Sequence, residues 1–129
     1  MIVEVKQEHI DNGVKGFPCY CAVSLAVYDA LKDKYNFTDS EGLDYYGKEE
    51  VEVGESWVET SVCGSGAEIS IFTKLEDGKI VEDYIAIEDE APINSMNALA
   101  LERWIEDFDT FDNSKPTSFV IEDIHRMNN

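Results

Sequence analysis

Alternation of apolar and polar positions predicts β-strands near both ends of the chain and in its middle. Residues Ile2–Val5 alternate and predict a short first strand. Apolar residues spaced through 51–62 predict one or two further strands, which the glycines of 64–66 end. Residues 117–121 predict the last strand, which follows a turn at 112–116 and precedes a tail with no predicted element.

The clearest local pattern is that of a β-hairpin in the second half of the chain. Residues 67–71 alternate apolar and polar, and the alternation resumes over 79–88. Asp77-Gly78, between them, supplies the residues that a two-residue type I′ turn prefers. We therefore predict two antiparallel strands with one apolar face and with their acids at the edges or on the other face.

Apolar residues at helical spacing predict two main helices. The first covers 19–35 and begins after Pro18, with a stripe made by Tyr20, Val23, Val27, Leu31 and Tyr35. The second has Asn94 or Ser95 as its N-cap and an apolar face made by Ala98, Leu101, Trp104, Ile105 and Phe108. Residues 7–12 add a single helical turn before Gly13.

This order of elements, β-α-β-β-β-α-β, predicts an α+β fold. We expect one domain over residues 1–129, with a mostly antiparallel sheet of four to five strands and the two main helices. No internal repeat or linker interrupts the chain.

The chain is strongly acidic, with 28 Asp and Glu against 10 Lys and Arg and a formal net charge of −18. Residues 1–40 hold six acids and four bases, and residues 41–129 hold 22 acids and six bases. Binding to DNA or RNA depends on Lys and Arg that neutralise phosphates, so this charge argues against direct nucleic-acid binding. An anionic membrane surface is unfavourable for the same reason. The acids alternate with apolar residues, so we expect them on the surface of a folded domain.

The first residues and the cysteines indicate a compartment. Residues 1–7 contain neither a basic segment nor a long apolar stretch, so we expect no signal peptide and no transmembrane helix. The cysteine count of three is odd, and one residue separates Cys19 from Cys21. Reduced thiols and a cytoplasmic location are the predictions that follow.

Residues at both ends of the chain resemble a known family. The opening Gln7-Glu8-His9-Ile10-Asp11-Asn12-Gly13, followed by Cys19, Cys21 and Ala22–Ala26, is similar to that of a recurrent family of small phage-encoded proteins of unassigned function. Trp104-Ile105 with Phe108-Asp109, then Pro116 and Ser118-Phe119, resembles the closing helix and final strand of that family. The chain departs from the family in having one residue between Cys19 and Cys21 and in having Ala22 where proline is common, so the resemblance implies no thiol or metal role. The resemblance implies a phage genome as the source, and hence the host cytoplasm as the location, but no activity.

Cys19, Cys21, Cys63 and His9 are candidate ligands of a Cys₃His zinc site, because thiolates and one imidazole suit a tetrahedral ion. The single residue between Cys19 and Cys21 is shorter than zinc spacings, so buried packing roles are the favoured interpretation and we predict no cofactor. Cys19 as a nucleophile with His9 as its base is a further alternative. No orienting group or oxyanion loop accompanies that pair, so we expect a protein that is not an enzyme.

The acidic surface is the feature with the strongest functional interpretation. We predict that its carboxylates imitate nucleic-acid phosphates and occupy the basic groove of a host nucleic-acid-binding protein. Such a chain would be a phage accessory or anti-defence protein that blocks a host effector, such as a CRISPR or restriction component. The predicted partner-binding residues are Glu82, Asp83, Glu88, Asp89, Glu90, Glu102, Glu106, Asp107, Asp109 and Asp112. Several of them lie near the end of the second helix, where the dipole disfavours negative charge, as expected if binding is selected at some cost in stability.

Three alternatives stay open. In the first, the acidity serves solubility alone. In the second, the protein binds and sequesters a metal or small ligand around Cys19, Cys21 and His9. In the third, it is a structural accessory that forms homo-oligomers through aromatic residues such as Tyr45, Tyr46 and Trp57.

Overall fold

The structure, a computed structural model, describes residues 1–38, 51–90 and 95–127. Its elements follow in the order β1 (Ile2–Val5), α1 (Gln7–Asn12), α2 (Ala22–Leu31), β2 (Ser56–Val62), β3 (Ala67–Lys74), β4 (Ile80–Ile87), α3 (Ala98–Thr110) and β5 (Thr117–Arg126). The predicted α+β class is confirmed, and α1 is the predicted single helical turn. In the described ranges, none of the helices is long and apolar enough to cross a bilayer.

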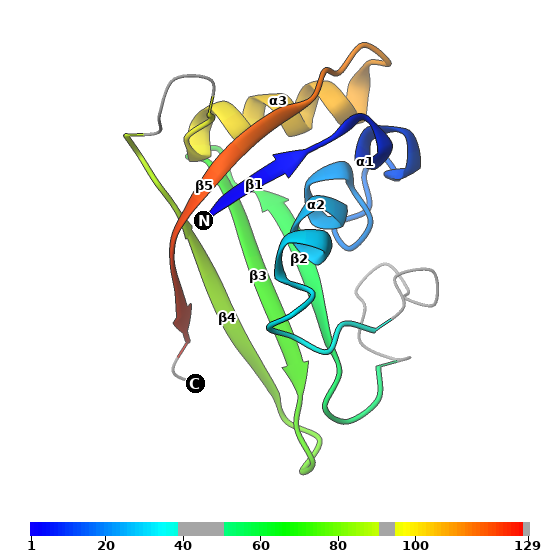
Figure 1. Cartoon of the computed structure of the whole chain (residues 1–129), viewed down its shortest axis with the longest axis vertical. Coiled ribbons are helices and arrows are strands. Elements are labelled where there is room, and N and C mark those ends of the chain that lie inside the picture. The colour runs from blue at the N-terminus through cyan, green and yellow to red at the C-terminus, as the bar shows by residue number, and fades with distance from the viewer. Residues whose placement is uncertain (39–50, 91–94, 128–129) are drawn as a thin grey trace.

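The strands of the described residues form one antiparallel sheet in the order β1-β5-β4-β3-β2. Hairpins join β2 to β3 and β3 to β4, whereas β5 returns after α3 to lie between β1 and β4. The sheet curls, with α2 in its hollow and α3 across one end (Figure 1). The first strand and β2 are therefore its two edges.

The inner face of the sheet shares one hydrophobic core with the two longer helices. Val23, Val27 and Leu31 form the buried stripe of α2, at the spacing of one helix face. The contribution of α3 is Leu101, Trp104, Ile105 and Phe108, and that of the strands is Val3, Val5, Val58, Ala67, Ile69, Ile71, Ile85, Ile87, Phe119 and Ile121. Successive strand side chains point to opposite faces, so the residues between these lie on the outer face.

Among the described residues, a small apolar cluster packs on one end of the outer face. There the rings of Trp57 and Phe72 stack with centroids 5.4 Å apart, and Cys19 and Val51 complete the cluster. The two longer helices pack on the inner face and α1 packs against α2, so within the described residues no helix covers the rest of this outer face. Trp57 is fully buried, so it is not available for the oligomer contact that the third alternative assigned to it. Tyr45 and Tyr46 lie outside the described residues.

The free edge of β2 is hydrogen-bonded by three segments from elsewhere in the chain. The backbone N–H groups of alternate β2 residues donate to the carbonyl of Asn36, the hydroxyl of Tyr28 and the carbonyl of Pro18. Burial of the Tyr28 ring raises the pKa of its hydroxyl above the usual value, so this group stays protonated as it caps the strand. This edge is therefore closed to another strand along most of its length.

Both longer helices begin later than predicted. The carbonyl of Pro18 accepts hydrogen bonds from the Thr60 N–H and the Ser24 hydroxyl, so the segment before α2 is held against β2 as a turn. For this reason α2 begins at Ala22 rather than at 19; it ends at Leu31, before the predicted end at 35. The start of α3 is capped by the side chain of Asn97, which accepts the N–H of Ala100, and not by Asn94 or Ser95.

The predicted hairpin is confirmed, but its turn has three residues rather than two. The N–H of Leu75 donates to the carbonyl of Lys79, and the N–H of Gly78 donates to the carbonyl of Leu75 at 2.9 Å. Gly78 has a φ of 83°, which is the left-handed conformation that closes such a turn and favours glycine. The Asp77 carboxylate accepts the N–H of Lys79 at 2.9 Å and so stabilises the turn.

The last strand continues to Arg126, well beyond the predicted end at Ile121. A register shift beside Ala86 lets Ile121 pair with Ile87 while Ile124 pairs with Ile85. Two inward residues three positions apart break the alternation by which a strand is recognised in sequence. The extension brings an arginine into the sheet.

Candidate functional site

Seven of the predicted partner-binding acids form two separate groups at the end of the molecule that α3 crosses. Glu88, Asp89 and Glu90 directly follow β4. The second group, Glu106, Asp107, Asp109 and Asp112, lies at and just beyond the end of α3. The end of β4 and the start of α3 both hydrogen-bond to β5 at 118–120, so they lie side by side. The acids of α3 begin at Glu106, well after the helix start at Ala98, so the two groups lie about 12 Å or more apart along the helix. They do not form one continuous stripe.

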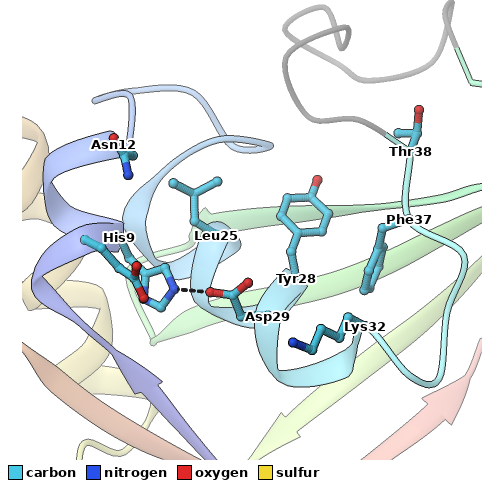
Figure 2. A pocket seen from close by; sticks show the side chains of 9 residues that line it. His9, Asn12, Leu25, Tyr28, Asp29, Lys32, Phe37 and Thr38 are labelled. Atoms are coloured by element: carbon cyan, nitrogen blue, oxygen red, sulfur yellow. Dashed lines mark hydrogen bonds and ion pairs between the residues drawn. The ribbon is translucent and has the colours of Figure 1, made fainter.

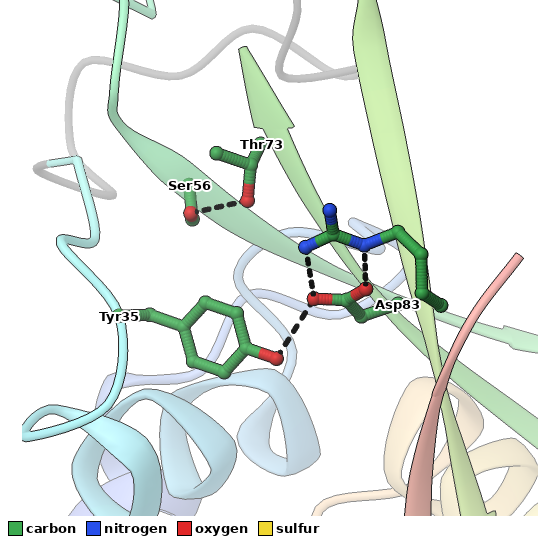
Figure 3. Close-up of polar contacts among 5 residues, drawn as sticks. Tyr35, Ser56, Thr73 and Asp83 are labelled. Carbon is green, nitrogen blue, oxygen red and sulfur yellow. Dashed lines mark hydrogen bonds and ion pairs between the residues drawn. The ribbon is translucent and has the colours of Figure 1, made fainter. Parts of the chain in front are cut away.

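Asp83 and Glu102 are buried, so the prediction that they belong to an exposed acidic surface is wrong. Asp83 is 6% exposed on the inner face, where Arg126 binds it through Nε at 2.5 Å and Nη2 at 3.2 Å (Figure 3). The Tyr35 hydroxyl donates to the same carboxylate at 2.9 Å. Glu102 is 4% exposed and accepts the N–H of Gly64 at 2.6 Å, which ties α3 to the turn between β2 and β3.

The charges of the Asp83 cluster are matched within the fold. The Arg126 guanidinium holds the pKa of the Asp83 carboxyl below its usual value, against the effect of burial, and the Tyr35 hydrogen bond adds to the lowering. Burial, and then the hydrogen bond to Asp83, raise the pKa of Tyr35 to about 12. This cluster is therefore a structural contact at the end of β5 and contributes no exposed negative charge.

Lys15 offsets the unfavourable charge predicted at the end of α3. Its ammonium donates to the carbonyls of Phe108 and Phe111, the second at 2.5 Å. It also lies 4.5 Å from the centroid of the Phe108 ring and 3.6 Å from an Asp112 carboxylate oxygen. A cation at this position satisfies helix carbonyls that have no partner in the helix and matches the dipole.

The same loop uses one more of the predicted acids. The N–H of Gly16 donates to the Asp109 carboxylate at 2.9 Å. Asp109 and Asp112 thus have roles in the fold as well as exposed side chains. Glu106 and Asp107 are exposed on α3, and the described residues give neither an ion pair.

The outer face of the sheet brings together acids from four neighbouring strands. Register places Glu59 level with Ser70, Ser70 level with Tyr84, and Tyr84 level with His125, in one row across β2, β3, β4 and β5. Beside this row, on β3, β4 and β5, lie Glu68, Glu82 and Asp123. Strands are about 4.8 Å apart, so Glu68 and Asp123, on either side of β4, are about 10 Å apart. We call Glu59, Glu68, Glu82 and Asp123 the outer acidic face; only Glu82 was among the predicted residues.

Tyr84 reports the negative charge at the centre of this face. Burial raises the pKa of its hydroxyl above the usual value, and the charges of Glu68, Cys63 and Asp89 raise it further, in that order. The charge of Asp89, just after β4, is therefore close enough to act on Tyr84. On this face, the carboxylate of Asp123 lies 3.5 Å from Nε2 of His125.

The four residues of the zinc alternative do not come together in the described parts of the chain. Cys19 packs in the cluster of Trp57, Cys21 is buried at the start of α2, and Cys63 lies in the exposed turn after β2. Burial raises the pKa of Cys21 above its usual value, which keeps it a neutral thiol. The group of candidate metal ligands within these parts is instead Glu8, His9 and Asp29.

His9 lies beside an open cleft of about 670 Å³ between α1, α2 and residues 37–38 (Figure 2). Its Nδ1 accepts the N–H of Lys6 at 2.9 Å, as part of the cap of α1. Its Nε2 faces a carboxylate oxygen of Asp29 at 2.5 Å. Because Nδ1 accepts a hydrogen bond, the neutral ring carries its proton on Nε2 and donates it to Asp29.

Both ring nitrogens of His9 are therefore occupied. A metal at Nε2 needs the ring proton on Nδ1, where it would face the Lys6 N–H, so the cap and a metal exclude each other. The same two bonds leave no nitrogen to act as a base for Cys19. We conclude that Glu8, His9 and Asp29 do not fit a metal centre while α1 is capped.

The geometry defines an antiparallel α+β domain whose outer sheet face is acidic and free of helices in its described part. Comparison of the chain with protein-family models, with curated proteins and with solved structures finds no match. The resemblance to a phage-encoded family consequently stays a prediction.

Proposed function

We propose that this chain acts by stoichiometric binding to another protein, in whose basic nucleic-acid-binding groove its carboxylates take the place of phosphates. In this proposal it is a phage accessory or anti-defence protein, and its partner is a nucleic-acid-binding effector of the host. The observation that carries the proposal is the outer acidic face, where the strand register sets four carboxylates on a rigid surface.

The spacing and rigidity of these carboxylates support the proposal. Across-sheet separations of about 10 Å fall within the range of duplex groove widths, about 6 to 12 Å. Each acid sits on a strand whose backbone is fixed by hydrogen bonds to its neighbours. A pre-organised charge pattern steers association and costs little ordering on binding.

Affinity capture tests the proposal. The tagged chain is incubated with a bacterial lysate at about 50 mM and about 200 mM salt, and bound proteins are then eluted with a duplex of about 20 base pairs. We expect to capture basic nucleic-acid-binding proteins and to release them with the duplex, because the duplex and this chain would compete for one groove. Recovery should fall by about tenfold or more at the higher salt.

Charge-matched variants separate a specific surface from bulk acidity. Glu68→Lys with Asp123→Lys changes the outer acidic face, and Asp33→Lys with Glu76→Lys makes the same change in net charge elsewhere on exposed positions. We expect the first pair to abolish capture and the second to retain it. Equal losses in both, or recovery of proteins that duplex DNA does not release, would overturn the proposal.

A further inference from the structure

A small cleft opens between the end of β2, the second half of α3 and the loop before α2. Its volume is about 210 Å³, and its walls include Phe17, Pro18, Val62 and Ile105, with Asp109 at one side. Sites for small-molecule ligands are larger, about 300–1,000 Å³. The cleft is of a size to receive one side chain rather than a metabolite.

The walls of this cleft are apolar and partly open to solvent. Phe17 is 38% exposed and Val62 is 41% exposed, whereas Ile105 beneath them is 5% exposed. A rigid apolar depression with a polar surround is the usual form of an anchor site in protein interfaces. The apolar surface here is thus available to a partner without any change in the fold.

Acidic residues border the cleft, and no Lys, Arg or His is among the described residues that line it. Asp109 lines it, and Glu106 lies three residues earlier on α3, so the two are neighbours on the helix surface. The Gly16 N–H fixes the Asp109 carboxylate at 2.9 Å. The bonds of Lys15 to the end of α3 hold the loop that carries Phe17. The depression and its negative border are therefore set before binding.

We propose that this cleft receives one large apolar side chain of the protein partner, such as Leu or Met, flanked in the partner by Lys or Arg that pair with Asp109 and Glu106. The inference rests on the proposed function, since it supplies the second contact of the same basic partner. Charge pairs set the approach and the orientation of a partner, and a buried apolar anchor slows its dissociation.

Two synthetic peptides test the anchor directly. Acetyl-Lys-Lys-Leu-Lys-Lys-amide and its analogue with central Ala have equal charge, and each is titrated to about 5 mM into the isotopically labelled full chain while amide NMR shifts are recorded. We expect the Leu peptide to shift the amides of Gly16, Val62 and Ile105 by about fivefold more than the Ala peptide does. Equal shifts from the two peptides at these amides, or none from either, would overturn the anchor.

Matched valine variants complete the test. Val62→Asn changes the cleft, and Val53→Asn changes an exposed valine elsewhere, 52% exposed against 41%. The Leu preference should vanish in Val62→Asn and persist in Val53→Asn; its persistence in both would overturn the inference. Lysate capture by Val62→Asn keeps the two proposals apart. If Val62→Asn captures the duplex-released proteins as tightly as the unmodified chain does, the proposal for the outer acidic face is supported and the anchor is refuted.

Discussion

Replacing Arg126 by Met should destabilise the fold because it leaves the Asp83 carboxylate buried without its cation. Asp83 is 6% exposed and receives two hydrogen bonds from Arg126 and one from Tyr35. Methionine keeps much of the apolar length of the arginine side chain and removes the guanidinium. The variant therefore tests the charge pair with little change in packing.

The magnitude follows from the burial of the two partners. Breaking a fully buried ion pair costs about 3–5 kcal/mol. The Arg126 side chain is 59% exposed, so water screens the pair and reduces this value. Hydrogen bonds to a charged group contribute about 1.5–3 kcal/mol. We expect Arg126→Met to lower the free energy of unfolding by about 2 kcal/mol at neutral pH.

The dependence on pH gives a second readout of the same pair. Arg126 holds the pKa of Asp83 below the ordinary value of 3.8. A carboxyl with a lowered pKa stabilises the fold at any pH above its ordinary pKa, and this contribution is lost as the pH falls through the lowered pKa. The difference between the unmodified chain and Arg126→Met should be largest at about pH 5 and above, and should shrink below about pH 4.

Urea unfolding followed by far-UV circular dichroism, from about pH 7 to about pH 3, measures both effects. The double variant Asp83→Leu with Arg126→Met removes both charges and should be less destabilised than the sum of the single variants, by about 1–2 kcal/mol. Lys79→Met, at the tip of the hairpin, is the control and should stay within about 0.5 kcal/mol. A loss for Arg126→Met that is no larger than this control, or one that is constant down to the lowest pH, would refute the reasoning.

Three further predictions concern single contacts. Lys15→Met should lower the free energy of unfolding in urea by about 1–2 kcal/mol because the carbonyls at the end of α3 lose their cation; a change no larger than that of the exposed Lys34→Met would contradict this role. Tyr35→Phe should remove from the tyrosinate absorbance titration the phenol whose pKa is about 12. Because the pKa of Tyr35 is raised, its hydrogen bond stabilises the fold fully below pH 10.0, the ordinary pKa of tyrosine, and this contribution is lost as the pH rises through about 12. A titration that is the same in Tyr35→Phe and in the unmodified chain would contradict this assignment. Zinc or a chelator should leave the thermal midpoint unchanged because both nitrogens of His9 are occupied; a zinc-dependent increase that Asp29→Asn removes would contradict this.

The hydrophobic core could be predicted because its pattern is local. Val23, Val27 and Leu31 repeat at helical spacing, and Leu101 and Phe108 do so in α3, where they bury the same face. In β4, the alternation that places Ile85 on the inner face also places Asp83 there, two residues earlier. That signal is present in the sequence: an acid on the inward side of a strand is expected to be buried and paired with a cation, not exposed on the surface.

The outer acidic face could not be predicted to the same extent, because it depends on which strands are neighbours. Glu68 and Asp123 are far apart in the chain. They share one part of the outer face only because β5 inserts next to β4. The extension of β5 that carries Asp123 and Arg126 follows a register shift, which removes the alternation from its sequence. Strand order and bulges arise from long-range pairing, so no local window contains them.

The basic residues of the fold explain why so much negative charge stays on the surface. Lys15 binds the end of α3, Arg126 binds Asp83, and Lys74 donates to the carbonyl of Val51 at 3.2 Å. These cations are placed where backbone carbonyls or a buried carboxylate need them. Glu68 and Asp123 carry like charges about 10 Å apart on the outer acidic face, and their repulsion costs stability. Charge reversal there should therefore leave the fold as stable as before, or more stable, while it weakens binding. If the acidity served solubility alone, charge reversal on the outer acidic face would not weaken binding while stability is kept, because any exposed acid would then serve as well as any other.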